Sequence, residues 1–165
     1  MADPLHDVKL FSSLSAGHRE ILDRVMVDEE LKHGHVLFRE GDKAGGMVGL
    51  YVLRSGTLTV QVSRPEGGFA TVTTIQAGEV VGLIGLVLPE AKRTGTLVAT
   101  GAARVSHLSR PAFLSLYHSN APLACAFQLA IARQLVLDLR RVDLALRAAV
   151  LDRVRGVPLG SIHIG

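Results

Sequence analysis

The sequence predicts an α+β domain in which a small antiparallel β sandwich or roll lies between helical ends. Its apolar residues follow a helical period near the start and again from Ser119 onward. Between His35 and Leu108 they form short β-branched runs that are punctuated by glycines. A length of 165 residues is enough for one sizeable hydrophobic core and not for two. We therefore expect one domain over residues 1–165.

The first predicted element is a short amphipathic helix over residues 11–27. Ser15 is a suitable N-cap, because its hydroxyl can accept a hydrogen bond from the first helical turn. Apolar residues recur after it at helical spacing, at Ile21, Leu22, Val25 and Met26. We assign residues 1–33 to an N-terminal helical part.

Residues 34–108 are predicted to form the β region. The clearest strand is 57–63, where Leu58, Val60 and Val62 alternate with polar residues. Turn-forming sequences separate the expected strands, at residues 40–42, 45–46, 55–56 and 65–68. Several short strands at this spacing favour an antiparallel sandwich or roll.

Helices are predicted over residues 109–155. Asn120 is a good N-cap for the longer of them, and Pro122 suits its first turn. Glycine and proline are then absent until Gly156. Two residues later Pro158 prevents the helix from resuming, so residues 156–165 form a tail. This tail is either a frayed terminus or a docking peptide for an unknown protein partner, with apolar anchors at Leu159, Ile162 and Ile164.

The long C-terminal helix has two apolar faces. One follows the 4-3-4-3 spacing of a coiled-coil seam, and the other repeats every seven residues. The seam comprises Leu135, Leu139, Val142, Leu146 and Ala149, and the second face comprises Leu137, Leu144 and Leu151. A surface helix needs only one apolar face. We expect a homodimer through Leu135, Leu139, Val142 and Leu146, with the second face on the β region; the alternative is a helix buried within one chain.

Positive charge exceeds negative charge by three, with 18 Lys and Arg against 15 Asp and Glu. Residues 1–118 hold 12 basic and 12 acidic side chains, so the whole excess lies in residues 119–165. A dedicated nucleic-acid-binding domain usually concentrates more positive charge, including lysine. We therefore expect no DNA binding.

The apolar runs and the cysteine content predict a cytoplasmic protein that does not enter a membrane. Residues 1–7 lack the basic and apolar stretches of a signal peptide. The longest apolar run, 80–88, is interrupted by glycines and is too short to cross a bilayer. A single cysteine, Cys125, excludes a disulfide framework and a cysteine metal site.

No pattern of residues indicates an enzyme or a metal centre. The sequence offers no recognisable Ser-His-Asp or Cys-His arrangement and no paired carboxylates in a catalytic context. His33 and His35 would share one face of a strand, but no third ligand stands at a matching spacing. We expect a protein that is not an enzyme and holds no metal.

Residues 78–96 are the most informative segment for function. A glycine turn leads into a short apolar stretch, and Arg93-Thr94-Gly95-Thr96 follows it. If the apolar stretch is a helix, its first amides can bind an anion, and an arginine facing them adds bidentate donors. The segment indicates either a phosphate-binding site or a surface arginine beside an ordinary helix.

Five segments, in this order and spacing, resemble the cyclic nucleotide-binding domain family, which includes the sensory domains of catabolite-activator-type proteins, kinase regulatory subunits and gated channels. They are residues 10–14, 34–42, 51–58, 78–96 and 109–113, and the resemblance extends over residues 10–149. It implies an α+β fold: an antiparallel β roll of the double-stranded jelly-roll type, an N-terminal helix and a long C-terminal helix. Residues 78–96 resemble the family's phosphate-binding cassette.

The resemblance implies roles for individual residues of this segment. Arg93 would pair with the phosphate of a cyclic nucleotide, and the backbone amides from Gly82 through Leu83 to Ile84 would complete the anion site. Thr94 stands where a family hydroxyl reaches the phosphate or the purine. The implied ligand is cAMP or cGMP.

Two further positions bear on the ligand. In family members that bind nucleotide, the residue after Gly82 is a glutamate that accepts a hydrogen bond from the ribose 2′-hydroxyl, whereas this chain has Leu83. Losing a hydrogen bond to a charged group weakens binding by about 10- to 100-fold. Gly95, the small residue after Arg93-Thr94, would keep space for the ligand.

The expected function is that of a stand-alone regulatory module, which binds a cyclic nucleotide or a related anionic ligand weakly and signals through its C-terminal helix. In activator-type relatives a helix-turn-helix module follows that helix, and the sequence shows none after residue 155. The alternative is a degenerate domain that binds no ligand and acts in oligomerisation or protein interaction. Arg93 and Thr94 favour the sensor, and Leu83 favours the alternative.

Overall fold

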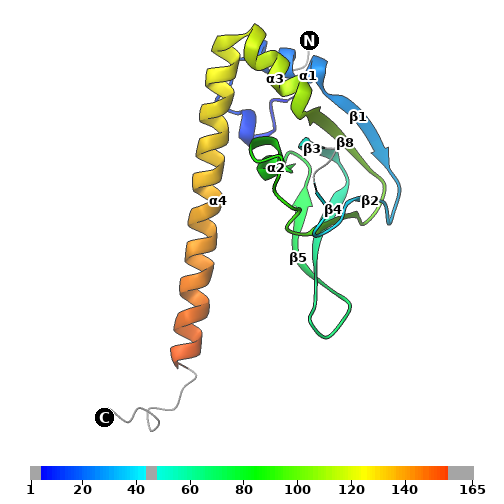
Figure 1. Ribbon diagram of the computed structural model, residues 1–165, viewed down its shortest axis with the longest axis vertical. Helices are drawn as coiled ribbons and strands as arrows, with labels where there is room; N and C mark the ends of the chain where they lie inside the picture. Colours follow the sequence, from blue (N-terminus) through cyan, green and yellow to red (C-terminus); the bar gives the residue numbers. More distant parts are fainter. Residues whose placement is uncertain (1–4, 44–47, 156–165) are drawn as a thin grey trace. The chain divides into compact units, whose positions relative to one another are not determined.

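The computed structural model describes residues 5–43 and 48–155, and it confirms an α+β fold with an N-terminal helix and a long C-terminal helix. In chain order the elements are η1 Lys9–Phe11, α1 Ala16–Val25, β1 Val27–Leu31, β2 Val36–Phe38, β3 Gly49–Ser55, β4 Thr57–Ser63, β5 Phe69–Gln76, β6 Val80–Val81, α2 Leu83–Val87, β7 Thr96–Ala99, β8 Ala103–Ser109, α3 Arg110–Ser119 and α4 Ala121–Arg155 (Figure 1).

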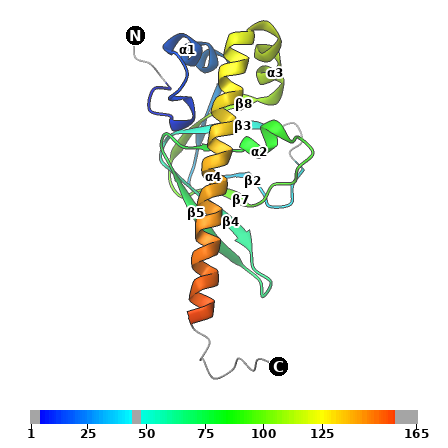
Figure 2. The same ribbon diagram turned by 90° about the vertical axis from the view of Figure 1, so that its left-hand side faces the viewer.

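The described strands form two four-stranded antiparallel sheets that make up the predicted β roll. One sheet has the order β1-β8-β3-β6 and the other β2-β7-β4-β5. A buried cluster fills the space between them, with contributions from both sheets, among them Tyr51, Leu53, Leu58, Leu97 and Val105. In both views the β4–β5 hairpin extends from the roll at the end opposite α1 and α3 (Figures 1 and 2).

The N-terminal helix is shorter than the sequence predicts. Helix α1 begins at Ala16 rather than at residue 11, because Ser15 caps it: the Ser15 hydroxyl accepts a hydrogen bond from the backbone N–H of His18 at 3.2 Å. Residues 27–31, inside the expected helical part, form strand β1. Its charged sequence does not alternate clearly, and its strand conformation depends on pairing with β8, from Val27 opposite His107 to Leu31 opposite Ala103.

The strand predicted at residues 57–63 is confirmed as β4. The turn before it requires glycine, since Gly56 has a φ of +85° and a Cβ there would lie 2.5 Å from the carbonyl oxygen of Ala102. The turn expected at residues 45–46 lies outside the described residues.

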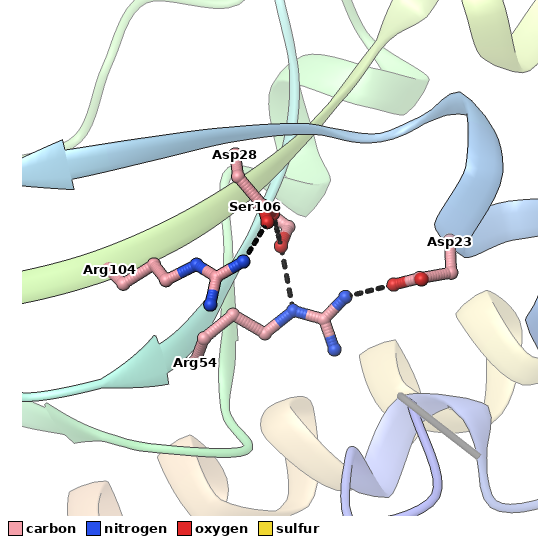
Figure 3. A network of polar contacts seen from close by, with 5 residues as sticks. All are labelled: Asp23, Asp28, Arg54, Arg104 and Ser106. Carbon is pink, nitrogen blue, oxygen red and sulfur yellow. Dashed lines mark hydrogen bonds and ion pairs between the residues drawn. The ribbon is translucent and has the colours of Figure 1, made fainter. Parts of the chain in front are cut away.

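A polar network on the outer face of the first sheet connects it to α1 (Figure 3). The Nε of Arg54 donates a hydrogen bond to the fully buried Ser106 hydroxyl at 2.7 Å, and the guanidinium also pairs with Asp23 of α1. The Ser106 hydroxyl in turn donates to Asp28, which pairs with Arg104. Four elements, α1, β1, β3 and β8, are therefore joined by charge-assisted hydrogen bonds.

The predicted cap of the long helix is confirmed, since the side-chain oxygen of Asn120 accepts a hydrogen bond from the N–H of Leu123 at 3.1 Å. The first turns of α4 pack through Phe127, whose ring meets Phe11 at 5.6 Å and Phe113 at 5.5 Å between centroids. The chain divides into two compact units, 1–130 and 131–165. The tail at 156–165, with its anchors, lies outside the described residues.

By length and composition alone, one helix among the described residues is apolar enough to cross a membrane. It is residues Ala121–Leu151 of α4, with a mean hydropathy of 1.3 over its most apolar window. The apolar run at residues 80–88 lies elsewhere in the chain, and the window in α4 differs from it because it includes charged residues between its apolar ones. Core helices of soluble proteins also meet this criterion, so it is weak evidence for a membrane.

Candidate functional site

Two backbone hydrogen bonds fix the position of Arg93. Its N–H donates to the carbonyl of Asp42 at 2.9 Å, and its own carbonyl accepts from Gly41 at 2.9 Å. The turn itself is closed by the Asp42 carboxylate, which accepts from the N–H of Arg39 at 3.1 Å. The turn after β2 thus fixes the point at which the chain returns toward β7.

The Arg93 side chain is buried, with only 8% of its surface exposed. Its guanidinium carbon lies 4.2 Å from the ring centroid of Phe38, a cation–π contact that stabilises a desolvated cation by about 2 kcal/mol. Burial lowers the pKa of Arg93, while the nearby Tyr51 and Asp42 act in the opposite direction. Because an arginine stays protonated in proteins, a positive charge is held inside the roll.

Gly82 brings the start of α2 next to this charge. Its φ of +85° is a left-handed conformation at the N-cap of α2. A Cβ at Gly82 would lie 2.5 Å from the carbonyl oxygen of Gly49, so only glycine fits. The same Cβ position is 3.5 Å from Nη1 of Arg93. The predicted arrangement of an arginine beside the N-terminus of a short helix is therefore present.

The other predicted site residues occupy different environments. Leu83 is buried, with 7% exposed, and Ile84 is half exposed at 47%. Thr94 is exposed. The structure thus brings Gly82 and Arg93 together inside the roll, while the side chains of Ile84 and Thr94 reach solvent.

Gly95 has a packing reason that sequence reasoning did not give. A Cβ there would lie 2.8 Å from Cγ1 of Val60 and 3.2 Å from the carbonyl oxygen of Gln61, both on β4. The close approach of β4 therefore requires a glycine at this position. Space for a ligand is not needed to explain it.

Two residues that interact electrostatically with Arg93, Tyr51 and His107, are not among the site residues that the sequence predicts. His107 is expected from the sequence to be a satisfied or solvent-facing side chain, whereas its Nε2 is buried without a partner among the described residues. The two residues are opposite each other in the β3–β8 ladder, and their rings stack with centroids 4.3 Å apart and planes 12° apart. Tyr51 also contacts Phe38, with 6.3 Å between centroids. Only strand register places these residues together, and a single sequence gives no signal of it.

Tyr51 Oη and His107 Nε2 are both buried and have no hydrogen-bond partner among the described residues. A buried polar group without a partner costs about 1–3 kcal/mol. Burial raises the pKa of the Tyr51 hydroxyl, an effect that Arg93 opposes, and burial lowers the pKa of His107. Both groups are therefore uncharged near neutral pH.

Within the described residues, no group of three or more His, Cys, Asp or Glu side chains could hold a metal ion. The paired histidines of the sequence make other contacts. Nδ1 of His33 lies 2.9 Å from the carbonyl oxygen of Thr100, and Nε2 of His35 lies 3.8 Å from the Glu29 carboxylate.

A family model described as "Cyclic nucleotide-binding domain" matches residues 28–120, more than half of the chain. The chain belongs to the cyclic nucleotide-binding domain family. The matched range contains seven of the eight described strands in full, together with α2, Gly82 and Arg93. A search of curated proteins finds no match.

Solved structures of several regulatory proteins share the fold. The catabolite activator protein of Thermus thermophilus is 25% identical with a TM-score of 0.74, over 86% of this chain and 63% of that one. The N-terminal domain of a transcriptional regulator from Streptomyces coelicolor is 24% identical with a TM-score of 0.72, over 83% and 95%. The regulatory domain of Toxoplasma gondii PKA, solved with cAMP, is 22% identical with a TM-score of 0.63, over 79% and 46%. This chain thus spans less than two thirds of the Thermus and Toxoplasma proteins.

Proposed function

We propose that this protein is a regulatory module that binds a cyclic nucleotide, cAMP or cGMP, and is not an enzyme. The observation that carries the proposal is the buried guanidinium of Arg93 beside the N-cap glycine of α2. A cation held inside the roll suits the phosphate of such a ligand, because two parallel hydrogen bonds and full charge can be offered at once. The family match and the cAMP-bound Toxoplasma relative support the same ligand class.

The residues of the site fit the ligand in part. Arg93 would hold the phosphate, and the backbone from Gly82 to Ile84 would lie beside it. At the position where the family resemblance implies a carboxylate for the ribose, Leu83 is apolar and buried. The carboxylate of Glu79 is already engaged, since it accepts a hydrogen bond from the N–H of Gln76 at 2.8 Å. Glu79 is therefore a poor substitute for the missing ribose-binding carboxylate. We therefore expect binding that is weaker by about 10- to 100-fold than with a glutamate at position 83.

We propose further that the bound nucleotide favours one state of α4 over another and so transmits the signal. The apolar seam of α4, Leu135, Leu139, Val142 and Leu146, would join two chains in a homodimer. A cytoplasmic location fits the regulators among its structural relatives. We expect neither DNA nor a membrane as a direct partner of this domain.

The second candidate function is a domain that binds no nucleotide and serves as an oligomerisation or interaction module. Leu83 favours it, because a buried leucine supplies no hydrogen-bond acceptor to a ribose. The exposed apolar seam of α4 is compatible with either function.

The two functions are separated by titration calorimetry of cAMP and of cGMP into the wild-type protein and Arg93→Ala. We expect saturable binding to the wild type and a loss of at least about 10-fold in Arg93→Ala, since a charge-assisted contact is removed. Arg64→Ala is the matched control, because Arg64 is exposed in the β4–β5 hairpin.

Circular dichroism of each variant verifies that it is folded. Binding by the wild type and by Arg64→Ala, with loss in Arg93→Ala, supports the sensor. If folded wild-type protein gives no heat with either nucleotide, the sensor proposal is wrong and the interaction module takes its place.

A further inference from the structure

The polar atoms inside the roll are distributed unevenly. Most side chains of the central cluster are aliphatic. The hydroxyl of the buried Thr96, on β7, accepts a hydrogen bond from the N–H of Glu40 at 3.0 Å. Tyr51 Oη and His107 Nε2 differ, since neither has a partner among the described residues. Both side chains interact electrostatically with Arg93.

Contacts connect these two residues to Arg93 without interruption. Arg93 lies on Phe38, Phe38 contacts Tyr51, and Tyr51 stacks on His107. We call these four residues the aromatic–arginine row. The Cβ position of Gly82 is 3.5 Å from Nη1 of Arg93 and also 3.5 Å from Cδ2 of Tyr51, so both side chains border the same point at the start of α2.

The absence of a side chain at Gly49 leaves space for the His107 ring of this row. A Cβ at Gly49 would lie 2.4 Å from Nε2 of His107, so the imidazole occupies its place only because residue 49 is a glycine. Gly82 admits the first turn of α2 in the same way. Gly49 thus leaves space for the imidazole of His107, whereas Gly82 is required by the carbonyl of Gly49 and is only in ordinary contact distance of the Tyr51 ring.

The unpaired hydroxyl of Tyr51 destabilises the unliganded protein. Its side chain is fully buried, and a phenylalanine would fill nearly the same volume without an unpaired hydroxyl. A buried, unpaired hydroxyl on a side chain that interacts electrostatically with Arg93 is a candidate for a contact completed by the ligand.

We propose that Tyr51, supported by His107 beside it, is a ligand-binding residue whose hydroxyl bonds to a ribose or phosphate oxygen of the nucleotide held by Arg93. This inference rests on the proposed function and deepens it. The Tyr51 hydroxyl would give the ribose–phosphate group a polar contact, which the apolar side chain of Leu83 cannot provide.

The chemistry of the two groups suits such an oxygen. The Tyr51 hydroxyl can donate to a phosphate oxygen, or accept from a ribose hydroxyl while donating elsewhere. Because burial keeps the Tyr51 hydroxyl protonated and the His107 ring neutral, neither group brings a charge that competes with Arg93 for the phosphate.

The test compares Tyr51→Phe with wild-type protein by calorimetry of cAMP and by thermal unfolding. Tyr117→Phe is the matched control, because it removes the hydroxyl of a partly exposed tyrosine on α3. We expect Tyr51→Phe to weaken cAMP binding by about 3- to 10-fold, the effect of one lost hydrogen bond. The unliganded variant should unfold at the same temperature as wild type or a higher one. Tyr117→Phe should leave the affinity for cAMP unchanged.

Titration with 2′-deoxy-cAMP identifies which oxygen of the nucleotide the Tyr51 hydroxyl contacts. If Tyr51 contacts the 2′-hydroxyl, the loss caused by Tyr51→Phe should disappear with 2′-deoxy-cAMP; if it contacts the phosphate, the loss should persist. Either result supports the inference. His107→Phe, which retains a stacked ring, should also weaken cAMP binding.

An unchanged affinity for cAMP in folded Tyr51→Phe, with binding that still depends on Arg93, would overturn this inference alone. Wild-type protein that binds neither cAMP nor cGMP would overturn both it and the proposed function. The Arg93→Ala titration therefore distinguishes the two failures.

Discussion

At the scale of single residues, Arg93 and Leu83 have opposite implications for the same ligand. Arg93 keeps a cation inside the roll despite the cost of burial, and Phe38 offsets part of that cost. Leu83 is buried one residue after the N-cap glycine, and its apolar surface is removed from water in the free protein. Under the proposed function, Arg93 would supply the phosphate contact, while Leu83 supplies no carboxylate for the ribose.

Leu83→Glu tests this account of the cassette. We expect the variant to bind cAMP about 10- to 100-fold more tightly than wild type, because a carboxylate would accept the ribose hydroxyl hydrogen bond. The measurement is calorimetry, with thermal unfolding beside it, since a glutamate at a buried position lowers the stability of the free protein.

Leu83→Gln is the control for charge and should gain less affinity. With 2′-deoxy-cAMP, Leu83→Glu should gain nothing. Equal affinities of folded Leu83→Glu and wild type for cAMP would contradict the assignment of position 83.

At the scale of elements, the apolar side chains of α4 are buried near its start and exposed farther along. Its first turns carry buried residues, such as Leu123 and Phe127. From residue 135 onward the apolar side chains are exposed, with Leu139 at 69% and Val142 at 64%. The unit 131–165 contains no second described element that could cover them. An exposed apolar seam of this length is typical of an interface.

Leu139→Asp tests the proposed homodimer. We expect wild-type protein to have twice the chain mass of 17.6 kDa by light scattering, and the variant to have the mass of one chain. A charge placed in a desolvated seam has no partner, and the burial of leucine is lost.

Leu144→Asp is the matched control on the opposite face of α4, and it should leave the dimer intact. Wild-type protein with the mass of one chain would show that the seam has another role.

At the scale of the whole molecule, the first unit is held together by more than its apolar core. The network of Asp23, Arg54, Ser106, Asp28 and Arg104 joins α1 to three strands on the outside of the roll (Figure 3). The Ser106 hydroxyl lowers the pKa of Asp28, and Arg104 adds to this effect.

The direction of this shift predicts how stability depends on pH. Because the pKa of Asp28 in the folded state is below its ordinary value of 3.8, its stabilising contribution is complete above that value and is lost as pH falls through the lower, folded-state pKa. We expect the melting temperature of wild-type protein to fall more steeply below about pH 4 than that of Asp28→Asn.

Thermal unfolding between pH 3 and 7 measures this difference. Asp7→Asn, which removes an exposed carboxylate outside the network, should leave the wild-type profile nearly unchanged. Parallel profiles for Asp28→Asn and wild type would show that the network does not stabilise the fold through Asp28.

Much of the fold could be predicted from local signals in the sequence. The caps at Ser15 and Asn120 and the alternating strand β4 depend on a few neighbouring residues, and the structure confirms each of them. Strand β1 was missed, because its sequence is mostly charged and only the ladder with β8 makes it a strand. In the candidate site, Gly82 and Arg93 were identifiable because they stand in one continuous segment.

The sequence by itself determined the class of the fold, the order of its helical and β regions and the segment that contains the arginine. These features follow from hydrophobic periodicity, glycine turns and spacing, which are local properties. Only the tertiary structure decided that Arg93 is buried on Phe38, that Tyr51 and His107 stack beside it, and that Gly95 is required by β4. Each of these depends on strand register, which pairs residues far apart in the sequence.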